Sequence, residues 1–156
     1  MWTCSRCKQK FVRRNQSHSC GPYSVAGFLK GKSAKGVRLF RLFLRAYTKI
    51  GPFELHPVKT RVALLRQIRF AAINKVGTDY LDGHFVLTFR LPDGSLIYKI
   101  DNLNGRYFVH HFRVRQPKDI QGELRKHMKL AYDVGTRKHI RKEPGIRASI
   151  ALERTQ

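Results

Sequence analysis

Residues 104–115 read NGRYFVHHFRVR, a pattern that predicts a β-strand leaving a tight turn. The pair Asn104-Gly105 favours a hairpin turn because both residues tolerate a positive φ angle. The side chains that follow alternate in character, as they do on the two faces of a strand. One face carries Phe108, His110, Phe112 and Val114, and the other carries Tyr107, Val109, His111, Arg113 and Arg115. We therefore expect the first face to be buried and the second, basic face to meet solvent.

The segment before this strand has the same period of two and is rich in β-branched and aromatic residues. It begins after Gly51-Pro52, a pair that ends a helix, and it contains the turn sequence Pro92-Asp93-Gly94-Ser95. The predicted strands cover residues 53–58, 61–67, 69–74, 84–91 and 96–101. Because the connections between them are short, we expect a mostly antiparallel sheet.

Helices are predicted before and after the strand-rich segment of the sequence. A short helix over 24–31 has Ser24 as its N-cap. The segment 37–50 repeats apolar residues at helical spacing, and the segment 118–135 ends at Gly135, a natural C-terminal cap. The predicted fold is therefore α+β, with helices packed on one face of a mostly antiparallel sheet and a C-terminal helix.

All three cysteines lie within the first twenty residues, together with one histidine, in the pattern C-x2-C-x10-H-x-C. The four residues are Cys4, Cys7, His18 and Cys20. Three thiolates and an imidazole complete a tetrahedral shell that leaves no position for water, so the pattern predicts a structural zinc knuckle over residues 1–22. A redox dithiol, free thiols and another metal are the alternatives, whereas three cysteines cannot all pair in disulfides.

The chain carries 32 Lys and Arg against 10 Asp and Glu, a formal net charge of +22. No acid occurs before Glu54. Such a charge attracts polyanions through Coulomb steering and counterion release, without sequence preference. We therefore expect nucleic acid, either DNA or RNA, as the partner. The alternative is a solvated basic surface without a partner.

The predicted nucleic-acid contacts lie on the knuckle, on the helix over 37–50 and on the basic strand face. On the helix, four cations fall three or four residues apart and line up as one stripe. A basic C-terminal tail over residues 136–156 adds further charge beyond the α+β domain of residues 23–135. The predicted contact residues are Arg6, Lys8, Lys10, Arg13, Arg14, Arg38, Arg41, Arg45, Lys49, His111, Arg113 and Arg115.

The first twenty residues also resemble a known pattern. Trp2-Thr3-Cys4-Ser5-Arg6-Cys7, Phe11 and Asn15-Gln16-Ser17-His18-Ser19-Cys20 look like the start of an uncharacterised bacterial domain family of unknown function. That family begins with a W-x-C-x-x-C knuckle and continues into a small α+β domain. The resemblance runs to about residue 135 and leaves the tail outside. It implies no activity, but similar domains occur fused to predicted nucleases and other DNA-handling modules, which favours nucleic acid by analogy.

One polar set on the predicted strands is suited to chemistry. His56, Lys59 and His110 are candidates for binding an anionic small molecule or for proton transfer, which is the alternative function. The chain has no clustered carboxylates for two-metal chemistry and no Walker, dinucleotide-binding or serine-hydrolase motif. The sequence therefore favours a binding protein over an enzyme. A protein-interaction adaptor, marked by an exposed apolar patch, is the third hypothesis.

No apolar run approaches the roughly 18 residues that a membrane-spanning helix needs. The start, Met1-Trp2-Thr3-Cys4, lacks the apolar core of a signal peptide. We expect a cytoplasmic protein without a membrane partner, associated with the nucleoid or with RNA.

Overall fold

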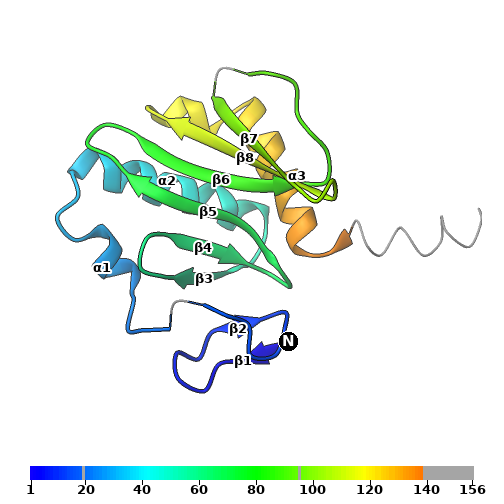
Figure 1. Ribbon diagram of the computed structural model, residues 1–156. Coiled ribbons are helices and arrows are strands. Elements are labelled where there is room, and N and C mark those ends of the chain that lie inside the picture. The colour runs from blue at the N-terminus through cyan, green and yellow to red at the C-terminus, as the bar shows by residue number, and fades with distance from the viewer. Residues whose placement is uncertain (19, 95, 139–156) are drawn as a thin grey trace, which may run out of the picture.

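The computed structural model describes residues 1–18, 20–94 and 96–138. It contains a six-stranded antiparallel sheet with strand order β3-β4-β5-β6-β8-β7 and a separate two-stranded sheet near the N-terminus (Figure 1). The elements in chain order are β1 (Trp2–Thr3), β2 (Lys10–Phe11), α1 (Val25–Leu29), α2 (Ala34–Ile50), β3 (Glu54–Pro57), β4 (Val62–Leu65), β5 (Arg69–Val76), β6 (Leu81–Leu87), β7 (Ile97–Leu103), β8 (Tyr107–Val114), the 3-10 turn η1 (Pro117–Ile120) and α3 (Glu123–Gly135). The predicted α+β class is confirmed.

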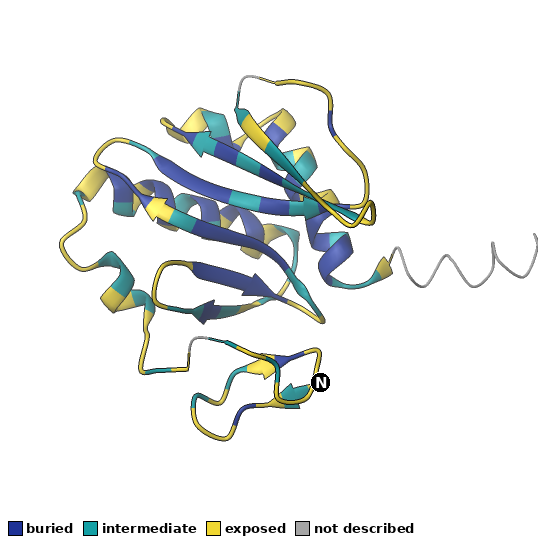
Figure 2. Ribbon diagram, viewed as in Figure 1, coloured by how far each residue is buried: buried dark blue, intermediate teal, exposed yellow. Residues whose placement is uncertain are grey.

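Helices α2 and α3 cover one face of the large sheet, behind the strands in Figure 1. Aromatic rings join the layers, because Phe43 of α2 stacks on Phe112 of β8 with ring centroids 5.3 Å apart. In the same layer, the Phe70 ring of β5 contacts the ring of Tyr47 in α2, with centroids 5.3 Å apart, and the ring of Tyr132 in α3, with centroids 5.5 Å apart. The central strands are buried along most of their length (Figure 2).

Helix α2 begins at Ala34, three residues before the predicted start. The reason is Ser33, whose Oγ accepts a hydrogen bond from the Gly36 N–H at 3.0 Å and donates one to the Thr78 carbonyl at 2.6 Å. The buried stripe of α2 includes Leu39, Phe40, Phe43 and Tyr47, whereas Leu44 and Ile50 are only partly buried.

Two predicted elements needed correction. Strand β6 covers 81–87 and not 84–91, because the turn closed by the Gly77 N–H and the Tyr80 carbonyl (2.9 Å) starts it early. At its other end, the Leu91 N–H donates to the His110 side chain and is not part of a strand ladder. The predicted helix over 118–135 is divided, because Gly122 has a φ angle of 68°, so that a 3-10 turn precedes α3.

The N-terminal unit, residues 1–22, packs against the β3 side of the sheet (Figure 1). Phe11 is its anchor: this side chain is only 2% exposed, and its ring lies 5.4 Å from that of His56 in β3. Lys10 forms an ion pair with Glu54 at 3.1 Å. The metal-ligand pattern is therefore held against the sheet by an apolar contact and an ion pair.

The predicted C-terminal tail lies outside the described residues from position 139 onward. In the described part of the chain, no helix has both the length and the apolar character needed to cross a membrane.

Candidate metal centre and the open face of the sheet

The four predicted metal ligands lie together. The Sγ atoms of Cys4, Cys7 and Cys20 and a ring nitrogen of His18 all lie within 4.8 Å of one another. The Cys4 and Cys20 sulfurs are 3.9 Å apart, and the Cys7 sulfur is 3.4 Å from His18 Nε2. The cysteines form no disulfide. These residues can hold a metal ion, and each provides one ligand atom.

Local backbone geometry explains why the two cysteines of the first pair converge. A turn returns the chain after Cys4, because the Lys8 N–H donates to the Cys4 carbonyl at 2.8 Å and the Cys4 N–H donates to the Gln9 carbonyl at 2.9 Å. Lys8 completes this turn in the left-handed region, with φ at 62°. The turn therefore points both thiols to one side.

The histidine ligand is oriented by a second hydrogen bond. His18 Nδ1 donates to the Gln16 carbonyl at 2.7 Å, which fixes the tautomer and leaves Nε2 with a free lone pair for a metal. Phe11 and Trp2 contact the same ring, with centroids 4.1 and 6.1 Å from it. The imidazole is thus positioned before any ion binds.

The thiols differ in their acidity. The backbone N–H groups of Cys7 and, to a smaller extent, Arg6 lower the pKa of Cys4 to about 6 despite its desolvation. Desolvation and the neighbouring thiols raise the pKa of Cys20. A metal ion therefore meets a thiol at Cys4 that is more easily deprotonated than the thiol of Cys20.

A cavity of about 270 Å³ lies between the N-terminal unit and the sheet face that the helices leave open. Its wall includes Arg61, Arg69, His56 and His84, and it contains no Asp or Glu. The cavity wall is therefore basic and carries no carboxylate.

Arg69 is the central cation of this cavity. Its Nε donates to His56 Nδ1 at 3.0 Å, one Nη donates to the Lys10 carbonyl at 3.3 Å, and the guanidinium carbon lies 4.6 Å from the Phe11 ring centroid. No carboxylate in the described residues pairs with it. Burial and then the charge of Arg61 lower the pKa of Arg69. Sequence reasoning missed this role, because Arg69 reads only as the first residue of a strand.

His56, a predicted candidate, is 3% exposed and forms part of the cavity wall. Burial, followed by the charge of Arg69, lowers its pKa to about 4. Because Nδ1 accepts from Arg69, the neutral ring carries its proton on Nε2. That Nε2 is buried and has no hydrogen-bond partner.

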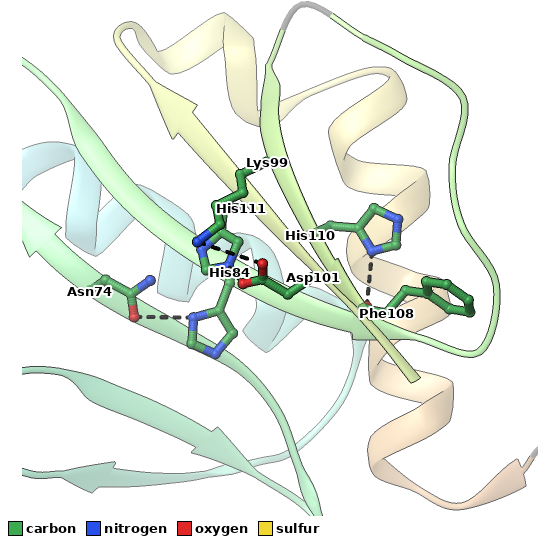
Figure 3. Close-up of polar contacts among 7 residues, drawn as sticks. All are labelled: Asn74, His84, Lys99, Asp101, Phe108, His110 and His111. Atoms are coloured by element: carbon green, nitrogen blue, oxygen red, sulfur yellow. Dashed lines mark hydrogen bonds and ion pairs between the residues drawn. The ribbon is translucent and has the colours of Figure 1, made fainter. Parts of the chain in front are cut away.

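The open face also carries a pair of histidines on β6 and β8, His84 and His111, of which His84 belongs to the cavity wall (Figure 3). His84 Nδ1 donates to Asn74 Oδ1 at 3.1 Å, and His111 Nε2 donates to Asp101 Oδ2 at 2.9 Å. The two rings lie 5.6 Å apart. Burial, then the charges of His111 and Arg61, lower the pKa of His84 to about 4. The Nε2 atom of His84 points towards β4 and β3 (Figure 3).

The predicted basic face of β8 is largely neutralised by neighbouring strands. Arg113 forms two hydrogen bonds to Asp82 of β6, at 2.7 and 2.8 Å, and these raise the pKa of Arg113. Its guanidinium also lies 4.2 Å from the Tyr80 ring centroid. His111 is paired with Asp101 of β7. Arg115, beyond the end of the strand, is exposed.

The predicted trio of His56, Lys59 and His110 does not form one site. His110 is fully buried on the helix side, where it stacks on Phe85, donates to the Phe108 carbonyl at 3.0 Å and accepts from the Leu91 N–H at 3.0 Å. His56 lies on the opposite face and four strands away, about 19 Å at the usual strand spacing. Lys59 is exposed in the β3–β4 turn. We therefore assign His110 to the core.

The predicted helical stripe is exposed along the whole of α2. Its four cations, Arg38, Arg41, Arg45 and Lys49, will be called the α2 stripe; all are exposed, and none pairs with a carboxylate within the described chain. Helix α2 contains no Asp or Glu. In the knuckle, Lys10 is paired with Glu54, and the other predicted contacts are exposed: Arg6, Lys8, Arg13 and Arg14.

No family model, no curated protein and no solved structure matches the chain. Neither a family nor an activity therefore comes to it by similarity.

Proposed function

We propose that this chain is a zinc-containing protein that binds nucleic acid through phosphate contacts of low sequence specificity, with the α2 stripe as the main contact. The observation that carries the proposal is an acid-free helix that exposes four cations on one side. Like charges at this spacing cost about 0.2–0.5 kcal/mol per pair. A polyanion along the stripe removes that cost and releases its own counterions.

The dimensions of the stripe suit a phosphate backbone. From Arg38 to Lys49 the helix rises about 16 Å at 1.5 Å per residue. This length corresponds to about five base pairs of B-DNA at 3.4 Å each, so several phosphates lie within reach of the four side chains. Backbone contacts of this kind position a nucleic acid but do not read its sequence.

The ligand distances support zinc as the metal. A tetrahedral zinc with Zn–S bonds of 2.3 Å separates two sulfurs by about 3.8 Å, and it separates a sulfur from a nitrogen by about 3.6 Å. The Cys4–Cys20 distance of 3.9 Å and the Cys7–His18 distance of 3.4 Å are close to these values. Four protein ligands leave no open position, which supports a structural role. Thiol ligands need a reducing compartment, and this supports a cytoplasmic location.

Binding is tested by titrating labelled single-stranded and duplex DNA and RNA into the zinc-loaded protein. The decisive variant is Arg41→Glu/Arg45→Glu. Its matched control is Arg90→Glu/Arg106→Glu, which reverses two exposed arginines outside α2. Each pair of reversals lowers the formal net charge by four, from +22 to +18.

We expect the wild type to bind at micromolar concentration or tighter near physiological salt, and the stripe variant to bind at least tenfold more weakly than the control. Because both variants have the same net charge, the comparison separates a contact surface from general attraction. If the two variants bind equally, the α2 stripe is not the contact.

A further inference from the structure

The cavity between the N-terminal unit and the sheet combines two features that a purely structural void would not need. Arg69 is half-buried there without a carboxylate, and His56 has a buried Nε2–H without an acceptor. Buried donors and cations are normally paired, because an unpaired one carries the full cost of its desolvation. What both groups lack is a negatively charged acceptor.

Arg61 places a second guanidinium at the same cavity. It is exposed in the β3–β4 turn, and its side chain forms part of the cavity wall. Its positive charge acts on His56, Arg69 and His84, which lie on three different strands. The field of Arg61 is thus directed into the cavity, and the cavity wall carries no carboxylate to cancel it.

We propose that this cavity is a binding site for a phosphate monoester, held by Arg61 and Arg69. Two guanidinium groups without a paired carboxylate match a dianion better than a singly charged carboxylate or phosphodiester, and a phosphate monoester carries about −1.5 to −2 at pH 7. The planar fork of arginine suits phosphate oxygens.

Two sources present this chemical group. One is a free mononucleotide, for which a cavity of about 270 Å³ has room beyond the phosphate itself. The other is the 5′-phosphate end of a nucleic-acid strand. The site lies on the open face of the sheet, whereas α2 packs on the opposite face, so it is separate from the α2 stripe and does not depend on it.

The test uses the zinc-loaded full chain and two pairs of probes in isothermal titration calorimetry. Adenosine 5′-monophosphate is compared with adenosine, and a short single strand with a 5′-phosphate is compared with the same strand ending in a 5′-hydroxyl. We expect the phosphorylated member of at least one pair to bind about tenfold or more tightly, the effect of a charged hydrogen-bonded contact. Preference within the first pair identifies a nucleotide site, and preference within the second identifies a strand end.

Three variants locate the effect. Arg61→Gln removes an exposed guanidinium and should abolish the preference, whereas Arg66→Gln, an exposed arginine of the β4–β5 turn that is not part of the cavity wall, should retain it. Val86→Phe fills the cavity from its half-buried rim with every charge intact, and it should also abolish the preference. Arg69 also contacts the Phe11 ring, so that replacing it would disturb the packing of the N-terminal unit. The test therefore uses no Arg69 variant.

The proposal is overturned if neither pair shows a preference, or if the preference survives in both Arg61→Gln and Val86→Phe. The α2 stripe has a separate signature. If the stripe is the contact, Arg41→Glu/Arg45→Glu weakens both strands equally, whatever their 5′ end, and leaves the binding of adenosine 5′-monophosphate unchanged. If the stripe is not the contact, this variant binds both strands as tightly as Arg90→Glu/Arg106→Glu does, and the preference for the 5′-phosphate remains.

Discussion

The histidines show how strongly the surroundings of a residue decide its role. His18 has Nε2 free beside three thiols, whereas His110 uses both ring nitrogens in the core. His84 lies between the two extremes. Asn74 of β5 and His111 of β8 contact it, and the charges of Arg61 and of Asp101 on β7 act on it. Burial dominates, and its pKa falls to about 4.

This shift makes His84 a source of acid sensitivity. Well above pH 6.5 the ring is neutral in both the folded and the unfolded chain and contributes nothing to the pH dependence. Between pH 6.5 and 4 the unfolded chain binds a proton that the folded chain excludes, so the free energy of unfolding falls as the pH falls. From pH 7 to pH 4.5 the free energy of unfolding decreases in both proteins. We predict that this decrease is about 2–3 kcal/mol smaller in His84→Gln than in the wild type.

Urea unfolding at a series of pH values measures this difference. Both proteins keep the same Cys/His unit, so any loss of metal at low pH is common to them and cancels. Parallel stability curves for the two proteins would show that His84 does not contribute.

At the scale of single residues, the sequence predicts contacts only between residues that lie close together in the chain. Cys4, Cys7, His18 and Cys20 lie within seventeen residues, and their spacing alone predicted the cluster. The pairing of Arg113 with Asp82, in contrast, joins residues 31 positions apart on adjacent strands. It depends on strand order and register, which the alternation of residues does not specify.

Helix α2 shows what fixes an element in place. Ser33 caps the helix and also donates to the Thr78 carbonyl in the β5–β6 turn, so one side chain joins the helix to the sheet. Ser24 caps α1 with the same geometry, through Gly27 at 3.0 Å, but it is exposed. The sequence identified Ser24 as a cap and missed Ser33, because the tertiary acceptor lies 45 residues away.

We predict that Ser33→Ala lowers the free energy of unfolding by about 2 kcal/mol, from a lost cap and a lost tertiary hydrogen bond of about 1 kcal/mol each. Ser24→Ala is the matched control and should cost about 1 kcal/mol or less, because it loses only a cap. Chemical denaturation followed by circular dichroism gives both values. Equal costs would mean that the bond to Thr78 adds nothing.

The N-terminal unit is a second element whose stability can be measured separately. Trp2 is the single tryptophan of the chain, and its ring lies 5.8 Å from that of Phe11. The unit is too short to bury a core of its own, so we expect its fold to depend on the metal. The fluorescence of Trp2 therefore reports on the metal centre.

We predict one zinc ion per chain, and a red shift of Trp2 emission when a chelator removes it. The far-UV circular dichroism should change little, because α2 and α3 pack in a separate core. Cys7→Ser should reproduce the red shift and lower the zinc content, and Ser5→Ala in the same turn should do neither. Purified protein without zinc, or Trp2 emission that ignores the chelator, would contradict the assignment.

At the scale of the whole molecule, the two proposed binding surfaces lie on opposite sides of one sheet. The α2 stripe is on the helix layer (Figure 1), and the cavity lies between the N-terminal unit and the open face of the sheet. The net charge of +22 was evident from composition, but its separation into unpaired and paired cations was not. Arg113 and His111 of β8 are paired with carboxylates of neighbouring strands, whereas the acid-free α2 cannot supply carboxylates of its own.

The unpaired cations of the α2 stripe predict a specific salt dependence of nucleic-acid binding. If the four cations of the α2 stripe each neutralise one phosphate, they contribute about −2.8 to the slope of log K against log salt for a single strand, and about −3.6 for a duplex. Other basic residues of so cationic a chain add to the total slope, so the informative quantity is the difference in slope between variants.

Arg41→Gln/Arg45→Gln should make the slope shallower by about 1.4 for a single strand and by about 1.8 for a duplex. Arg90→Gln/Arg106→Gln removes the same charge outside the helix and should leave the slope close to that of the wild type, because distant charges steer a ligand without displacing its bound counterions. Equal changes of slope in the two variants would mean that the nucleic acid responds to the total charge of the molecule and has no fixed position on α2.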